Sequence, residues 1–128
     1  MGKVVHDDVL DGALNIIKNN ATGLSANDAE PTDRTNAVTN SPTGSKLALI
    51  TVSGTDFTVA DDAGGGRKVT VAQKTETAGV DVTGTVNHVA LTDATRLLYV
   101  TTVSPTQAVT SGNDITIQTW DISIGDPT

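Results

Sequence analysis

Apolar side chains near the start of the chain recur at the spacing of an α-helix. The stripe consists of Val9, Leu10, Ala13, Leu14, Ile16 and Ile17. Aspartates precede it and asparagines follow it, and these residues are typical of the two ends of a helix. The pattern predicts a short helix over about residues 7–19. Because so short a helix is marginal alone, we expect its stripe to pack against the β domain or a neighbouring subunit.

From about residue 46 onward, apolar and polar residues alternate with the period of a β-strand. Short runs such as KVTVA, TVNHVAL and RLLYVTTV recur with turn residues between them. Near the end, Gly112 and Asn113 lie between two alternating runs, which predicts a β-hairpin. Many short strands with turn signals indicate a mainly β fold. We expect an antiparallel β-sandwich or barrel, with its β domain over about residues 46–125.

The last strand changes parity along its length. Ile115 and Ile117 share one side of the alternation, whereas Trp120 and the isoleucines after it share the other. A one-residue slip near Gln118 or Thr119 would bring both sets to the same face, and a β-bulge makes such a slip. We therefore expect a bulge at this point and Trp120 in the core.

A polar segment separates the helix from the strands. It covers about residues 27–44, contains two prolines and has few apolar side chains. A short strand is expected just before it, around Leu24–Ala26. Connections of this length in a compact domain are usually functional or disordered. The sequence predicts an exposed polar arm or long loop here, facing solvent or reaching a neighbouring subunit.

Composition and charge limit both the core and the partners. The 128 residues suffice for a single domain over residues 1–128. Only Phe57, Tyr99 and Trp120 are aromatic, so we expect an aliphatic core that gains stability from association. The formal net charge of −7 argues against nucleic acid and anionic membranes as partners. The chain has no cysteine, which excludes disulfides and thiolate catalysis.

The stretch DDAGGGRKVTV, residues 61–71, is the candidate for phosphate binding. A phosphate loop of the Walker type has lysine directly after its last glycine and then a helix. Here Gly66 is followed by Arg67 and by an alternating, strand-like run. We interpret the three glycines as a turn before a strand, with an anion site at its rim as the alternative.

Other reactive chemistry is sparse in the sequence. His6 and His88 have no partner at metal-ligand spacing. The aspartate pairs at 7–8 and 61–62 lack the pattern of a calcium loop, and no G-x-S-x-G motif occurs. We therefore expect no catalytic residue, no metal and no cofactor. A glycosidase pair made of carboxylates distant in sequence stays open.

Four segments together resemble a group of small virion structural proteins encoded by tailed bacteriophages. They are HDDVLDGALNIIKNNATGLSANDAEPT, GRKVTVAQ, GTVNHVALTD and QAVTSGNDITIQTWDISIGDP. The resemblance covers nearly the whole chain and concerns structural signatures, not catalytic motifs. Members of the group often carry cysteine near the position of Ala26 and an aromatic residue after the histidine, where this chain has Val89.

The resemblance implies a non-enzymatic virion component, assembled in the host cytoplasm and present in many copies. The first interpretation is a capsid decoration or cement protein that stabilises the head. It would bind the major capsid protein or other virion proteins as a homo-oligomer, with a trimer favoured. A tail, neck or fibre-associated protein is the second interpretation, and a carbohydrate-binding host-attachment module is the third. The candidate assembly contacts are Leu10, Leu14, Ile17, Pro31, Arg34 and Val38.

Overall fold

The computed structural model describes residues 4–127 and is mainly β with two helices. Its strands form three antiparallel sheets in the orders β2-β1-β6-β7, β3-β4-β9 and β5-β8. The elements are α1 (Asp7–Asn20), β1 (Gly23–Asn27), α2 (Arg34–Val38), β2 (Lys46–Thr51), a 3-10 turn (Gly54–Asp56), β3 (Phe57–Asp61), β4 (Arg67–Val71), β5 (Lys74–Glu76), β6 (Gly84–Thr92), β7 (Leu97–Val109), β8 (Ile115–Ile117) and β9 (Trp120–Ile124). The predicted mainly β, antiparallel fold with an N-terminal helix is confirmed, and the sheets of residues 4–127 do not close into a barrel.

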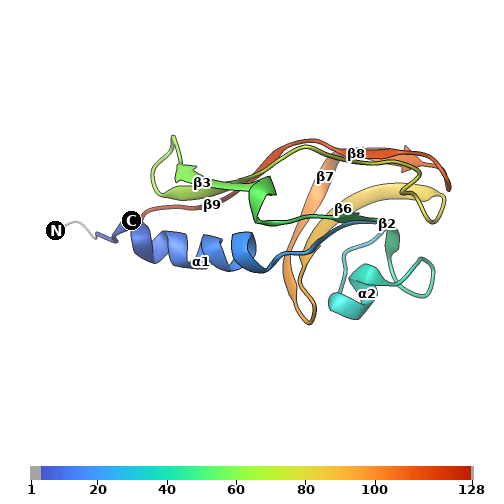
Figure 1. Ribbon diagram of the computed structural model, residues 1–128, viewed down its shortest axis with the longest axis horizontal. Coiled ribbons are helices and arrows are strands. Elements are labelled where there is room, and N and C mark those ends of the chain that lie inside the picture. The colour runs from blue at the N-terminus through green and yellow to red at the C-terminus, as the bar shows by residue number, and fades with distance from the viewer. Residues whose placement is uncertain (1–3, 128) are drawn as a thin grey trace.

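The molecule is elongated, with its two ends built differently (Figure 1). At one end, α1 lies along the three-stranded sheet. The other end holds the four-stranded sheet and α2. One hydrophobic cluster runs from α1 through both of these sheets, and Phe57 is the only aromatic residue in its buried part. The core is therefore aliphatic, as the composition predicts.

The helix α1 packs against β3 and β4. Its inner face buries Leu10, Leu14 and Ile17, and Leu14 is only 1% exposed. The helix begins after His6, whose Nδ1 accepts a hydrogen bond from the main-chain N–H of Asp8 at 3.1 Å. Both the helix and its packing against the β domain are confirmed.

The predicted slip in the last strand is a change of sheet. Up to Ile117 the chain pairs with β5, and from Trp120 onward it pairs with β4. Ile117 and Ile122 are both buried although their parities differ. The expected place of the slip is correct, but the expected bulge within one ladder is wrong, because the strand leaves one partner and joins another.

The hairpin predicted at Gly112 and Asn113 does not form. Gly112 makes a turn with a φ of 87°, but the strands on its two sides have different partners. β7 pairs with β6, whereas β8 pairs with β5. The local sequence identifies a turn between two strands, and only contacts distant in sequence decide that these strands diverge.

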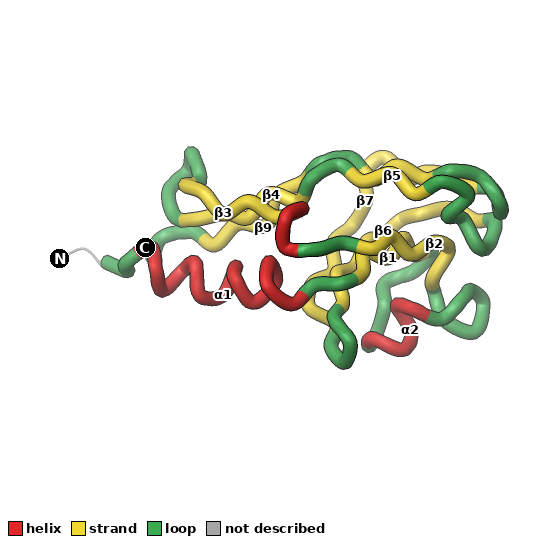
Figure 2. Tube along the Cα trace, in the orientation of Figure 1, coloured by secondary structure: helices red, strands yellow, loops and turns green. Residues whose placement is uncertain are grey.

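The polar segment, which spans residues 28–45 between the end of β1 and the start of β2, folds back on the four-stranded sheet. The short strand expected before it is β1, which is buried along its whole length. The segment contains α2, capped by Asp33, whose Oδ1 accepts from the N–H of Asn36 at 2.7 Å. Figure 2 shows α2 and its flanking loops against the ends of β1, β2 and β6. Within one chain the segment is a long loop that holds a short helix, and its contact with a neighbouring subunit stays a prediction.

The fully buried Asn27 of β1 fastens this segment. Its Nδ2 donates to the carbonyl of Ala37 at 3.1 Å and to Oγ of Ser45 at 3.0 Å. Its Oδ1 accepts from Oγ of Ser25 at 2.8 Å. Buried amides need such partners, so this hydrogen-bonded cluster keeps the polar segment folded against the sheet.

Candidate functional site

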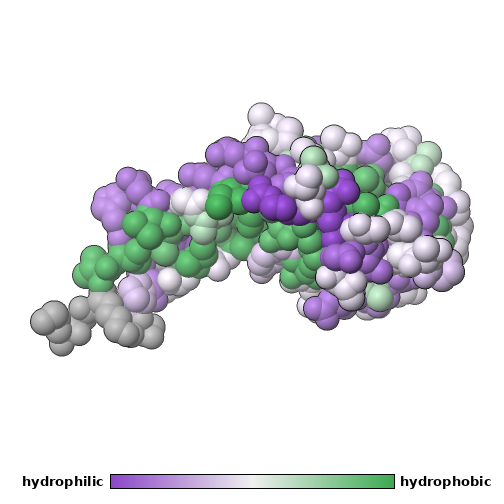
Figure 3. Space-filling view, turned by 90° about the horizontal axis from the view of Figure 1, so that it is seen from below, coloured by the Kyte–Doolittle hydropathy of each residue, from purple (hydrophilic) through white to green (hydrophobic). Residues whose placement is uncertain are grey.

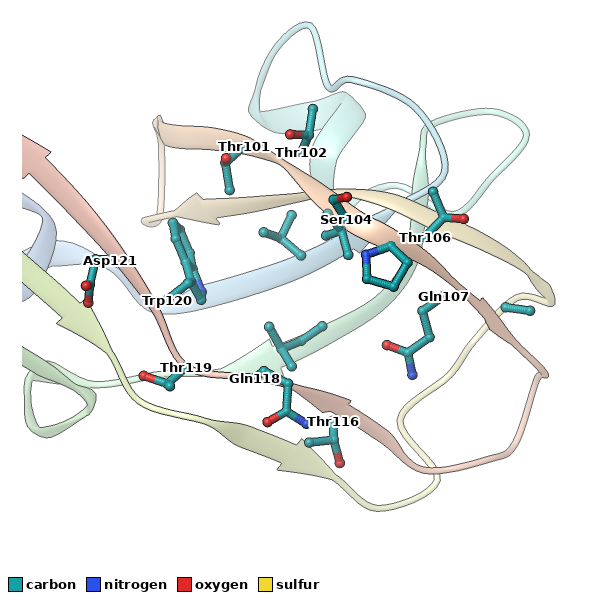
Figure 4. Close-up of a pocket in the computed structure, with 15 residues that line it drawn as sticks. Thr101, Thr102, Ser104, Thr106, Gln107, Thr116, Gln118, Thr119, Trp120 and Asp121 are labelled. Atoms are coloured by element: carbon teal, nitrogen blue, oxygen red, sulfur yellow. The ribbon is translucent and has the colours of Figure 1, made fainter.

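A groove of about 790 Å³ lies between β7 and the chain from Thr116 to Asp121. It opens where the hairpin was expected, because the strands on its two sides pair away from each other. β7, β8 and β9 each have one hydrogen-bonded neighbour and are edge strands of their sheets. Figure 4 shows the two walls, with Gln107 on β7 and Gln118 on the junction between β8 and β9. The groove is larger than a second pocket, of about 240 Å³, beside α2.

The wall made by β7 is irregular. His88 of β6 pairs with Thr102, and two positions earlier Val86 pairs with Gln107. Residues 103–106 of β7 therefore lie opposite Asn87 alone and bulge out of the ladder. Pro105, within this bulge, has no N–H to donate. This part of β7 lines the groove with side chains and not with a regular strand edge.

Two of the three aromatic side chains meet beside the groove. The ring centroids of Tyr99 and Trp120 are 5.8 Å apart, with an interplanar angle of 31°. Both residues are half-buried and pack against the edge of the core. Trp120 also lines the groove, and Figure 4 shows its ring reaching from β9 toward the wall that carries Thr101. The prediction that Trp120 lies in the core is therefore only half right.

The indole Nε1 of Trp120 is buried and has no hydrogen-bond acceptor within residues 4–127. An unsatisfied buried donor costs about 1–3 kcal/mol, so native proteins rarely leave one without a reason. It is the one buried side-chain nitrogen or oxygen in the described chain that lacks a partner. Trp120 therefore combines a shielded N–H with a ring that lines the groove.

Six other polar side chains line the groove and make no hydrogen bond to the described part of the chain. They are Thr101, Thr102, Ser104, Thr106, Gln107 and Gln118. The only charged residue of the lining is Asp121. Its carboxylate accepts from Oγ1 of Thr70 at 2.7 Å and lies 3.4 Å from Nζ of Lys68. The groove therefore offers neutral hydroxyl and amide groups beside an aromatic ring.

The glycine stretch at residues 64–66 turns a corner and holds no phosphate cradle. Gly65 and Gly66 have φ values of 97° and 86°, and a Cβ on Gly66 would collide with the carbonyl oxygen of Ile124. Only glycine fits this left-handed turn against β9. The prediction of a turn before a strand is confirmed, because β4 begins at Arg67.

Arg67 is engaged with carboxylates of its own chain. Its guanidinium bonds Asp11 at 2.7 and 3.1 Å and Asp61 at 2.6 Å. The hydrogen bond to Asp11, followed by the one to Asp61, raises the pKa of Arg67 above its ordinary value. An anion at the rim of the turn would have to displace these two carboxylates.

The candidate assembly contacts lie mostly inside the chain's own fold. Leu10, Leu14 and Ile17 are buried against the three-stranded sheet. Pro31 is buried, and Val38 is half-buried at the end of α2. The Nε of Arg34 donates to the carbonyl of Asp93 at 2.7 Å. Their part in assembly stays a prediction, and their visible contacts are within one molecule.

The outer side of α1 carries a second apolar surface, whose residues the sequence analysis assigned to the buried stripe. Val9 and Ile16, expected at the margins of the buried stripe, are 66% and 48% exposed. The exposed Ala13 lies between them at helical spacing. Figure 3 shows apolar colour along the part of the molecule formed by α1. We call Val9, Ala13 and Ile16 the outer face of α1.

The remaining chemical candidates stay apart in the fold. Nδ1 of His88 lies 2.7 Å from Oδ1 of Asn87, and His6 caps α1. Residues 4–127 contain no group of three or more metal-ligating side chains. In the same range, neither helix has the length and apolar content needed to cross a membrane.

The sequence reading missed the groove because its residues belong to strands. The run TTVSPTQ at residues 101–107 departs from regular alternation, and this is the one local signal that could have marked it. The opposite wall comes from a different sheet, so no spacing in the sequence joins the two. Comparison with known proteins adds nothing further, since no family model, no curated protein and no solved structure matches this chain.

Proposed function

We propose that this protein is a non-enzymatic structural component of a tailed-phage virion, and specifically a decoration protein of the head. The observation that carries the proposal is the outer face of α1. The buried face of α1 packs against the three-stranded sheet of the same chain, while Val9 and Ile16 on the other side of the helix are exposed to solvent. A helix with apolar side chains on both sides is typical of a helix packed between two layers.

The chain supplies only one of these two layers. The second layer would be the outer surface of the capsid shell, which each protomer would contact through Val9, Ala13 and Ile16. The whole-chain resemblance to virion structural proteins supports this choice of partner. Three weak contacts of this kind at a three-fold site would act together, because the first contact raises the effective concentration for the others. Apolar contacts also keep their strength at moderate salt, when exposed ion pairs are screened.

The test uses capsids assembled without the protein. Purified protein is added, and binding is measured by co-sedimentation and by the temperature at which the capsids break. Val9→Asp and Ile16→Asp should fold normally, since both positions are exposed, and should lose most capsid binding. Asn19→Asp is the matched control, because it adds the same charge to an exposed position of α1. Equal binding by all these variants would show that the outer face of α1 makes no contact with the shell.

A tail, neck or fibre position is the alternative within the virion. The same helix face could pack against a tail or neck protein, so the fold does not separate the two locations. Electron microscopy of particles carrying gold-labelled protein distinguishes them. Labels spread over the head would support a decoration protein. Labels confined to the tail or neck would overturn that assignment in favour of a tail or neck protein.

A further inference from the structure

We propose that the groove between β7 and residues 116–121 binds a neutral oligosaccharide. This site lies apart from the outer face of α1 and is argued from its own residues, so it does not rest on the proposed place in a virion. The argument rests on the polar lining, the aromatic pair and the shape of β7.

The lining matches the hydrogen-bonding pattern of a sugar. Hydroxyl groups of a sugar both donate and accept, and the free hydroxyl and amide side chains of the groove do the same. Gln107 and Gln118 stand on opposite walls, so a ligand lying between them can be held from both sides (Figure 4). The only charged lining residue, Asp121, is already bonded to Thr70 and Lys68. No lysine or arginine lines the groove, so nothing there selects an anionic ligand.

The aromatic pair supplies the apolar part of recognition. Trp120 lines the groove and packs against Tyr99, with 5.8 Å between the ring centroids. Indole rings present an apolar face together with one N–H donor. The indole N–H of Trp120 is itself shielded from solvent, so a ligand in the groove would contact the exposed part of the ring. Binding sites typically combine such an aromatic surface with a few converging polar groups.

The shape of β7 argues against a peptide strand as the occupant. Strand addition needs a regular edge that offers alternating N–H and carbonyl groups. Residues 103–106 bulge away from the ladder, and Pro105 has no N–H. Bulges and prolines are features that protect sheet edges from pairing. The side chains, and not the main chain, are therefore the recognition groups of this groove.

Trp120 is the only tryptophan of the chain and reports occupancy directly. The intact protein is titrated with neutral hexasaccharides of glucose, galactose, mannose and N-acetylglucosamine while tryptophan emission is recorded. At least one of them should give a saturable change. A sulfated hexasaccharide and an eight-residue threonine-valine peptide are run in parallel, and both should bind more weakly. Tighter binding by either one, or no saturable change with any neutral hexasaccharide, overturns the proposal.

Substitutions then locate the binding site. Gln107→Ala and Gln118→Ala should each weaken binding about 2- to 10-fold, the range that follows from one lost hydrogen bond. Gln73→Ala is the matched control, because Gln73 is exposed and lies outside the groove lining. Val9→Asp should bind the hexasaccharide as the parent does, which separates this site from capsid binding. Unchanged affinity in both groove variants would place the ligand elsewhere and overturn the assignment.

Discussion

Arg67 of β4 and Asp11 of α1 form a two-pronged ion pair across the interface between the helix and its sheet. Nε and Nη2 of the guanidinium bond the two carboxylate oxygens at 2.7 and 3.1 Å. Both side chains are less than one-fifth exposed. Arg67 directly follows the three glycines in the sequence, and their tight turn leads into β4, which begins at this arginine. The arginine that first suggests anion binding therefore fixes the position of α1.

Replacing this arginine by lysine should loosen α1. Arg67→Lys keeps the charge but loses the planar fork that bonds both oxygens of Asp11. We expect the melting temperature to fall by several degrees, measured by circular dichroism. Asp7→Asn, which removes an exposed carboxylate from the same helix, should change it much less. Equal melting of the parent and Arg67→Lys would mean that charge alone, without the two-pronged geometry, holds the helix.

The buried and exposed apolar residues of α1 should respond differently to truncation. Leu14→Ala removes a side chain that is 1% exposed and should cost about 3 kcal/mol of unfolding free energy. Ile16→Ala truncates a side chain that is 48% exposed and should change stability by about 0.5 kcal/mol or less. Urea unfolding measures both values. Similar losses for the two variants would contradict the orientation of the helix described above.

Asn27 should hold the segment of residues 28–45 in place. Asn27→Ala leaves the hydroxyl of Ser25 and the carbonyl of Ala37 without this buried partner and should cost about 3 kcal/mol. Hydrogen exchange should accelerate most at the N–H groups of Ser45 and Lys46, which donate to the carbonyls of Asn36 and Thr39 in this segment.

An exposed asparagine provides the control for this cluster. Asn19→Ala lies on the surface of α1 and should leave both the unfolding free energy and the exchange pattern nearly unchanged. Uniform acceleration of exchange throughout the Asn27→Ala protein would argue against a local role. It would mean that the segment and the sheet open together.

Asp93 should make stability depend on pH in the acid range. Hydrogen bonds from the N–H of Thr95, and then from Arg96, lower the pKa of this carboxyl from 3.8 to about 2. The folded pKa lies below the unfolded one, so the contribution is complete above about pH 4 and disappears as the pH falls toward 2. Arg34 donates to the carbonyl of the same residue, so the turn also anchors the segment of residues 28–45.

Replacing Asp93 by asparagine distinguishes the contribution of this carboxyl to stability from those of the other acidic residues. Asp93→Asn should be less stable than the parent at neutral pH, and the difference should shrink between pH 4 and pH 2. Urea unfolding at a series of pH values measures it. A difference that stays constant down to pH 2 would show that the charge of Asp93 contributes nothing.

The local features of this protein could be predicted from its sequence. The apolar stripe of Leu10, Leu14 and Ile17 predicts α1 and its buried face, because helical periodicity is a property of neighbouring residues. Alternation predicts most of the strands, and the parity change beside Gln118 predicts an irregularity at the correct place. The glycines before Arg67 are correctly predicted as a turn, since the strand pattern follows directly.

The tertiary structure decided which strands pair and which side chains remain free. Gly112 forms a turn, but the strands beside it pair with β6 and β5, because pairing depends on partners that are far away in sequence. The groove and its unpartnered Trp120 follow from that divergence and have no periodic signal. In the same way, Asn27 turns a polar segment into a folded loop by hydrogen bonds to residues 10 and 18 positions away. Periodicity reports which face of an element is apolar, and only the packed fold determines what covers that face.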